Sequence, residues 1–185
     1  METMEAIKGR RSIRQYKTTP VDDKTVELVL EAARWAPSWA NRQCWRFVVV
    51  RDSKIKAELA GTTYSQTNQA RESLKNAPVV IVACGELGKA GFSRDTGQPS
   101  TDKGEYWYMF DVGLATQNLV LEAYSLGLGT VIVGSFDAKT VAAILGVAEG
   151  FCVVAMTPLG YPDQDPGPRP RKELAEIVYH DKFGG

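Results

Sequence analysis

The sequence contains only one histidine, His180, which stands near the C-terminus. Zinc sites built on several histidines are therefore excluded. A Ser-His-Asp or Cys-His arrangement would have to use this one residue, and the simplest interpretation of His180 is a solvated side chain in a tail. The shortage of histidine argues against a hydrolase.

Cysteine is also scarce, and long apolar runs are missing. Cys44, Cys84 and Cys152 lie far apart without a CxxC pair, which favours free thiols over disulfides or metal ligation. No apolar segment reaches the roughly 20 residues that a membrane-spanning helix needs, and the charged N-terminus lacks the apolar core of a secretion signal. The sequence predicts a soluble, cytoplasmic protein without a membrane partner or a metal site.

Neither sign of charge is in excess. The 22 basic and 22 acidic residues give a net charge of zero, so nucleic acid is not favoured as a partner. With 185 residues, of which 44% are hydrophobic, the chain can bury one sizeable core but is too short to suggest two ordinary domains. We expect a single domain over residues 1–185.

Two common nucleotide-binding motifs are incomplete. Gly129 and Gly134 have the spacing of a P-loop, but Ser135 and Phe136 follow where lysine and a hydroxyl residue are required. Residues 127–130 also lack the third glycine of a dinucleotide fingerprint, and they enter a predicted strand instead of leaving one. A nucleoside triphosphatase is excluded, and a nicotinamide nucleotide would have no Rossmann site of its own.

Helical and strand patterns alternate along the chain. Asp22 or Asp23 can cap an amphipathic helix that Pro37 ends. Further helices are predicted at 106–126 and 137–145, and buried strands at 45–50, 78–84, 130–133 and 151–156. This order predicts an α/β or α+β sandwich with helices covering a sheet. Residues 86–105 form a long polar loop, and residues 174–179 could add an edge strand or extend over a neighbour.

Two basic clusters near the ends of the chain are candidates for anion binding. Residues 10–14, RRSIR, place three guanidiniums and a hydroxyl in one short segment, a composition suited to a phosphate. Arg169 and Arg171 flank Pro170 in a stiff, extended segment. Each cluster alone is more often a solvated surface than a binding site, so the significance of the two clusters depends on the segments between them.

Several motifs follow one another along the chain: RRSIRQY (10–16), APSWANRQCWRFVVV (36–50), DVGLATQNLVLEAYSLGLGTVIVGSF (111–136), PLGYP (158–162) and RPRK (169–172). Their order resembles the nitroreductase family of FMN enzymes over essentially the whole chain. The resemblance implies an α+β fold with a central, mostly antiparallel sheet flanked by helices. It also implies an intertwined homodimer with FMN at the subunit interface, in which the helix from Asp111 to Leu126 is dimer core. Burial of that helix within one subunit is equally compatible with the sequence.

The resemblance also implies a set of flavin-binding residues. Those assigned to FMN are Arg10, Arg11, Ser12, Arg14, Pro37, Ser38, Trp39, Asn41, Asn68, Gly134, Ser135, Arg169 and Arg171. Arg10, Arg169 and Arg171 would hold the phosphate, and Arg14 would reach the ribityl or the pyrimidine side of the ring, where a cation near N1 favours the reduced flavin. Arg11 has no specific contact assigned.

Other members of the set are assigned by position. Residues 37–41 would approach the ring from the other subunit, and Gly134 and Ser135 would present backbone to flavin N5, where glycine permits close approach. Asn68 would meet the pyrimidine edge, with Gln69 as its competitor. Cys44 replaces a proline that many relatives have, and Trp39 is bulky where a small residue is common.

The implied reaction is ping-pong hydride transfer from NAD(P)H through flavin N5 to a small acceptor such as a nitroaromatic or a quinone, and no side chain need be a general acid. Residues 86–108 are candidates for a lid over the acceptor. Enone reduction, dehalogenation and flavin cleavage occur on the same scaffold. The alternatives are a flavin-binding or storage protein without turnover, and a non-flavin interaction domain.

Overall fold

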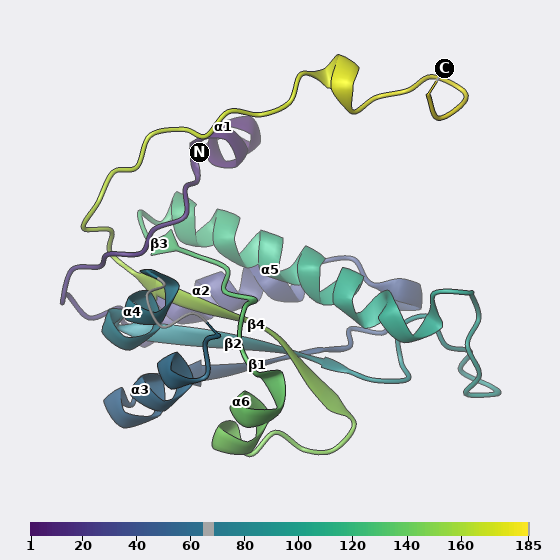
Figure 1. Ribbon diagram of the computed structural model, residues 1–185, viewed down its shortest axis with the longest axis horizontal. Coiled ribbons are helices and arrows are strands. Elements are labelled where there is room, and N and C mark those ends of the chain that lie inside the picture. The colour runs from purple at the N-terminus through teal and green to yellow at the C-terminus, as the bar shows by residue number, and fades with distance from the viewer. Residues whose placement is uncertain (65–68, 185) are drawn as a thin grey trace.

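A four-stranded antiparallel sheet forms the centre of the molecule, and helices cover both of its faces (Figure 1). The computed structural model describes residues 1–64 and 69–184. The sheet has the order β1-β2-β4-β3, with β1 (Trp45–Val50), β2 (Val79–Glu86), β3 (Gly129–Thr130) and β4 (Phe151–Gly160). The predicted α+β fold with helices on an antiparallel sheet is confirmed.

Six α-helices and three short 3-10 turns accompany the sheet in the described residues. They are α1 (Thr3–Gly9), α2 (Asp23–Arg34), η1 (Trp39–Asn41), α3 (Ser53–Gly61), α4 (Gln69–Asn76), η2 (Gly104–Tyr106), α5 (Trp107–Ser125), α6 (Ala138–Leu145) and η3 (Leu174–Glu176). Within the described ranges, none of these helices has the length and apolar character needed to cross a membrane.

Strand β2 separates two hydrophobic cores because its side chains alternate between the faces of the sheet. Val79, Ile81 and Ala83 pack with α2 and α5 on one face. Val80 and Val82 pack with α3, α4 and α6 on the other. A strand buried on both faces must be apolar throughout, which is why the run 78–84 is almost unbroken.

The predicted helix boundaries follow from capping residues. Asp22 accepts the N–H of Thr25 at 2.8 Å and begins α2, while Asp137 accepts the N–H of Lys139 at 3.0 Å and begins α6. Helix α2 ends at Arg34, before Pro37. These caps satisfy N–H groups that have no partner within a helix, so they are visible in the sequence.

The strands around β4 differ from the prediction. Strand β4 continues to Gly160, with Pro158 opposite Val80 of β2, whereas the sequence pattern ended it at residue 156. The strand tolerates Pro158 because proline removes one backbone donor and leaves the carbonyl, which accepts a hydrogen bond from the Tyr16 hydroxyl at 3.3 Å. Strand β3 is correspondingly short, and Val133 joins β4 only through an isolated bridge to Met156.

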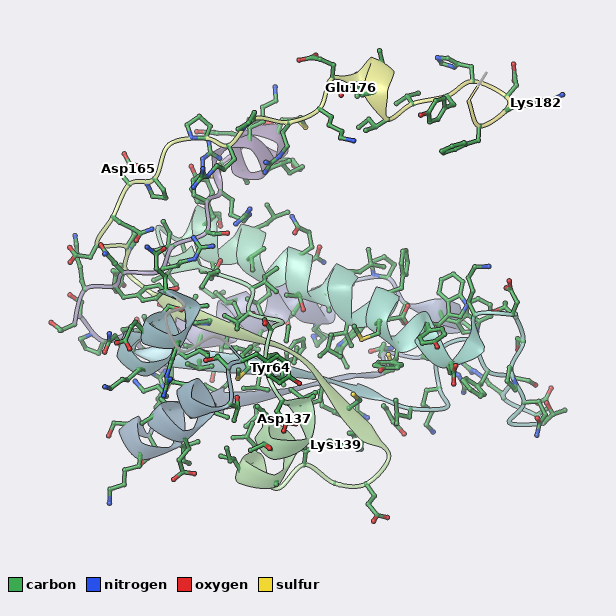
Figure 2. All side chains as sticks on the ribbon, in the orientation of Figure 1. Tyr64, Asp137, Lys139, Asp165, Glu176 and Lys182 are labelled. Carbon is green, nitrogen blue, oxygen red and sulfur yellow. The ribbon has the colours of Figure 1, made fainter. Side chains whose placement is uncertain are left out.

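The last part of the chain leaves the body as an extended arm, defined as residues 163–184. Asp165, Glu176 and Lys182 mark its course past α1 (Figure 2). Residues 174–176 form η3, and every arm residue from 167 onward is exposed. Residues 174–179 therefore do not extend the sheet of their own chain.

Candidate functional site

Backbone pairing brings the N-terminal arginines to the base of the arm. Ile13 donates its N–H to Thr130 at 2.8 Å, and Lys17 donates to Tyr161 at 2.9 Å. Asp163, the first arm residue, donates to Gln15 at 2.9 Å. The segment after α1 consequently runs beside β3 and the end of β4, and the arm passes α1 (Figure 1).

A pocket of about 440 Å³ lies between this segment and the arm. Its lining comprises Ile7, Lys8, Arg10, Arg11, Ser12, Arg14, Pro166, Gly167, Pro168, Arg169 and Arg171. Six of these side chains are basic, and none of the described residues that line the pocket is acidic. The pocket thus gathers all six residues of the two basic clusters that were assigned to FMN.

The electrostatics of the pocket favour an anion. Burial lowers the pKa of Arg10, and the neighbouring Arg11 and Arg171 lower it further. Within the described ranges, Arg10, Arg14, Arg169 and Arg171 form no ion pair with a carboxylate. Clustered cations repel one another, so a bound dianion such as a phosphate monoester would relieve this repulsion and could accept several charge-assisted hydrogen bonds.

Arg11 has a different environment from the other arginines. One of its guanidinium nitrogens donates to the carbonyls of Lys8, Gly9 and Arg10, at 2.5, 3.1 and 3.0 Å. These contacts satisfy carbonyls at the C-terminal end of α1, where a cation is favourable. Arg11 lines the pocket, but its hydrogen bonds are made to the carbonyls at the end of α1.

The loop of residues 37–44 lies at the opposite end of α5 from the pocket. Helix α1 packs near Tyr124, close to the C-terminal end of α5, whereas Trp39 contacts Asp111 near the N-terminal end. Asp111 and Tyr124 are 13 positions apart, which is about 20 Å along the helix. One chain therefore does not bring Pro37, Ser38, Trp39 or Asn41 to its own arginine pocket.

The same loop is tied to the candidate lid. Arg42 donates to the carbonyls of Lys89 at 3.2 Å and Phe92 at 3.4 Å, and Arg94 returns a hydrogen bond to the carbonyl of Ala40 at 2.8 Å. The rings of Trp39 and Trp107 pack with centroids 4.8 Å apart. The lid and the loop form one connected surface, a link that the sequence prediction missed.

A buried carboxylate, that of Asp111, contacts both ends of this loop. Asp111 is only 1% exposed; both of its oxygens lie 3.1 Å from the Trp39 amide nitrogen, and Oδ2 lies 3.7 Å from Cys44 Sγ. Burial and the nearby carboxylate raise the pKa of Cys44 to about 12, so the thiol stays protonated and can donate. Asp111 is not among the site residues predicted from the sequence, although an aspartate within a mostly apolar helix could have indicated a buried polar contact.

The burial of Asp111 leads to a pH-dependent prediction. Burial raises its pKa, although hydrogen bonds from Trp39 and Cys44 oppose that shift. A carboxyl group whose pKa is higher in the folded protein than in the unfolded chain stabilises the fold fully at a pH below its unfolded pKa. This contribution is lost as the pH rises through the pKa of the folded protein. We expect Asp111→Asn, which cannot ionise, to gain stability relative to wild type as the pH rises above about 4, the pKa of an aspartate in the unfolded chain.

Urea unfolding at a series of pH values measures this difference. The substitution Asp95→Asn is a control, because Asp95 is exposed in the lid. A stability difference between Asp111→Asn and wild type that stays constant or shrinks as pH rises would contradict the prediction.

Gly134 and Ser135 present exposed backbone between two bridges of the sheet. Ser135 accepts the N–H of Tyr64 at 3.3 Å. A Cβ added to Gly134 would meet nothing within 4 Å, so the space beside it is open. Asn68, assigned to the pyrimidine edge, lies outside the described residues, and its competitor Gln69 is exposed at the start of α4.

Comparison with known proteins identifies the family of the chain. Residues 7–161 match the model of the nitroreductase family. The chain is 33% identical over 193 residues to an NADH dehydrogenase of Thermus thermophilus, with 91% of each chain covered. It is 28% identical over 183 residues to the NADPH-flavin oxidoreductase of Vibrio harveyi, covering 98% of this chain and 74% of the relative.

Solved structures share the fold. A nitroreductase family protein from Clostridium novyi NT superposes with a TM-score of 0.79 and 32% identity, covering 100% of this chain and 96% of that protein. The chain therefore belongs to the nitroreductase family.

Proposed function

We propose that the chain is one subunit of a homodimeric, FMN-dependent oxidoreductase that passes hydride from NAD(P)H to a nitroaromatic, a quinone or a related small acceptor. The observation that carries this proposal is the pocket in which arginines from both ends of the chain meet without an opposing carboxylate among the described lining residues. The names of the Thermus and Vibrio relatives, a dehydrogenase and a flavin oxidoreductase, support the same reaction class.

The residues present fit FMN. Its phosphate is a dianion near neutral pH, and Arg10, Arg169 and Arg171 offer the donors and the positive charge that it requires. Ser12 adds a hydroxyl, and Arg14 would place a cation beside the pyrimidine side of the ring. At Gly134 the open space and the missing side chain leave room for a flat ring against the backbone.

FMN, when bound, would supply the hydride chemistry at N5. The chain would supply orientation and electrostatics. The arginines would fix the phosphate end, and Gly134 and Ser135 would set the distance between backbone and ring. The lid with Trp107 would shape the acceptor space and exclude water. None of these tasks needs a histidine.

The separation between the arginine pocket and the loop of residues 37–44 supports a dimer. The pocket and the loop 37–44 lie at opposite ends of α5, so a complete site needs the loop of a second subunit. Helix α5 and the turn η2 before it also expose a large apolar surface that a partner could cover: Tyr106 in η2 is 65% exposed, and Met109 and Phe110 in α5 are 46% and 58% exposed. The arm carries more, with Leu174, Ile177, Val178, Tyr179 and Phe183 all exposed.

The proposed function is tested by flavin absorbance. We expect the purified protein with FMN to be yellow, to bleach anaerobically with NADH or NADPH, and to recolour when a nitroaromatic or a quinone is added. Free FMN at the same concentration is the control. A yellow protein that neither nucleotide bleaches would favour a flavin-storage role, and a protein that takes up no FMN would contradict the proposal.

A further inference from the structure

Asp111 lies outside the arginine pocket, and the proposed reaction gives it no task. It occupies the second turn of α5, is 1% exposed, and has no ion pair within the described ranges. A buried carboxylate without a cation is unfavourable unless hydrogen bonds compensate it. A leucine of the same branched shape would fill the site without this cost, so packing alone does not explain an aspartate here.

The contacts of Asp111 lie at both ends of the loop between α2 and β1. Trp39, near the start of the loop, donates its backbone N–H to the carboxylate at 3.1 Å. Cys44 is the last residue of the loop before β1, and its Sγ lies 3.7 Å from Oδ2 of the same carboxylate. One side chain on α5 therefore holds both the start and the end of the loop.

The loop needs such a constraint because its backbone is unfavourable. Ala40, Asn41 and Gln43 have φ angles of 44°, 55° and 48°, in the left-handed region that residues other than glycine seldom adopt. Hydrogen bonds within the loop help, since Gln43 donates its N–H to the Ser38 hydroxyl at 3.0 Å. Such conformations persist only when contacts with the surrounding structure hold them in place. The buried side chain of Asp111 supplies two of these contacts, to Trp39 and to Cys44.

We propose that Asp111 is a positioning residue that holds residues 38–43 in the shape they present to the flavin of the partner subunit. This inference rests on the proposed function, because only a flavin site at the dimer interface gives that shape a use. Asp111 would act through Trp39 and Cys44, on the same surface that Arg42 and Arg94 connect to the lid.

The test compares two substitutions that keep the shape of the side chain. Asp111→Leu removes the acceptor, and Asp111→Asn keeps one acceptor oxygen. Asn118→Leu is the matched control: it makes the same change in shape on α5 but removes the hydrogen bond to the carbonyl of Ala32, 3.1 Å away on α2. Two quantities are measured, the hydrogen exchange of the Trp39 amide in the FMN-free protein and the dissociation constant for FMN.

We expect Asp111→Leu to accelerate exchange of the Trp39 amide about tenfold or more and to raise the FMN dissociation constant about tenfold, the factor of one lost hydrogen bond. Asp111→Asn should restore most of both. Unchanged values in Asp111→Leu, or equal changes in Asn118→Leu, would overturn the positioning role. So would weaker FMN binding without faster exchange at Trp39, because the effect would then bypass the loop.

Wild-type protein provides two further checks. Its Trp39 amide must exchange slowly; rapid exchange would show that the contact with Asp111 is not maintained, even if the leucine variant failed to fold. Wild-type protein that does not take up FMN would overturn the proposed function itself. Normal uptake in wild type together with normal uptake in a folded Asp111→Leu variant would overturn only the role of Asp111.

Discussion

Arg10→Ala is expected to raise the dissociation constant for FMN about tenfold to one hundredfold. The substitution removes a charge-assisted hydrogen bond to the phosphate, worth about 1.5–3 kcal/mol. Arg10 is partly buried, and burial lowers its pKa. Its charge is therefore poorly screened by water and is sensitive to a bound anion. Fluorescence titration of the FMN-free protein measures the change.

Riboflavin provides a sharp control for this prediction because it has the same ring and ribityl chain but no phosphate. Arg10→Ala should leave the dissociation constant for riboflavin nearly unchanged while that for FMN rises. Arg169→Ala should act in the same direction, since its guanidinium approaches the pocket from the arm. Unchanged FMN affinity in both variants, or an equal loss of riboflavin and FMN binding, would refute the phosphate assignment.

Phe110→Asp is expected to weaken the dimer by a factor on the order of one hundred or more. Phe110 is 58% exposed on α5 and packs edge-on against Trp107, with centroids 5.4 Å apart. In a dimer that covers this surface, the substitution would bury a carboxylate without a partner, at a cost of about 3–5 kcal/mol. Sedimentation over a range of concentrations measures dissociation of the dimer, and FMN content should fall as the dimer dissociates, because each proposed flavin site needs both subunits.

The control for Phe110→Asp is Ala143→Asp. Ala143 is also exposed on a helix, but α6 covers the opposite face of the sheet from α5 (Figure 1). The control introduces the same charge and should leave the dimer intact. A Phe110→Asp protein that remains dimeric at the concentrations where wild type is dimeric would show that α5 is not the interface.

Local elements of the fold could be predicted from the sequence because their signals are local. Asp22 and Asp137 cap helices whose apolar spacing is regular, and the apolar run of β2 reports burial on both faces. The arginine clusters were ambiguous as residues alone. The order of motifs that resembles nitroreductases predicted their meeting, and the structure places both clusters at one pocket.

Features that depend on distant partners could not be predicted. Strand β4 continues through Pro158 because β2 lies beside it, and pairing of this kind has no local signature. Asp111 and Trp39 are 72 residues apart, so their contact follows only from the packing of α5. The hydrogen bonds of Arg11 depend on where α1 ends, and residues 10–14 do not distinguish that role from phosphate binding.

The pocket between the N-terminal segment and the arm joins two parts of the chain that are distant in sequence. Its lining comes from residues 7–14 and residues 166–171, whereas every strand of the sheet lies between residues 45 and 160. An arm lost to proteolysis would yield a folded protein that no longer retains FMN, and flavin content would report whether the arm is intact.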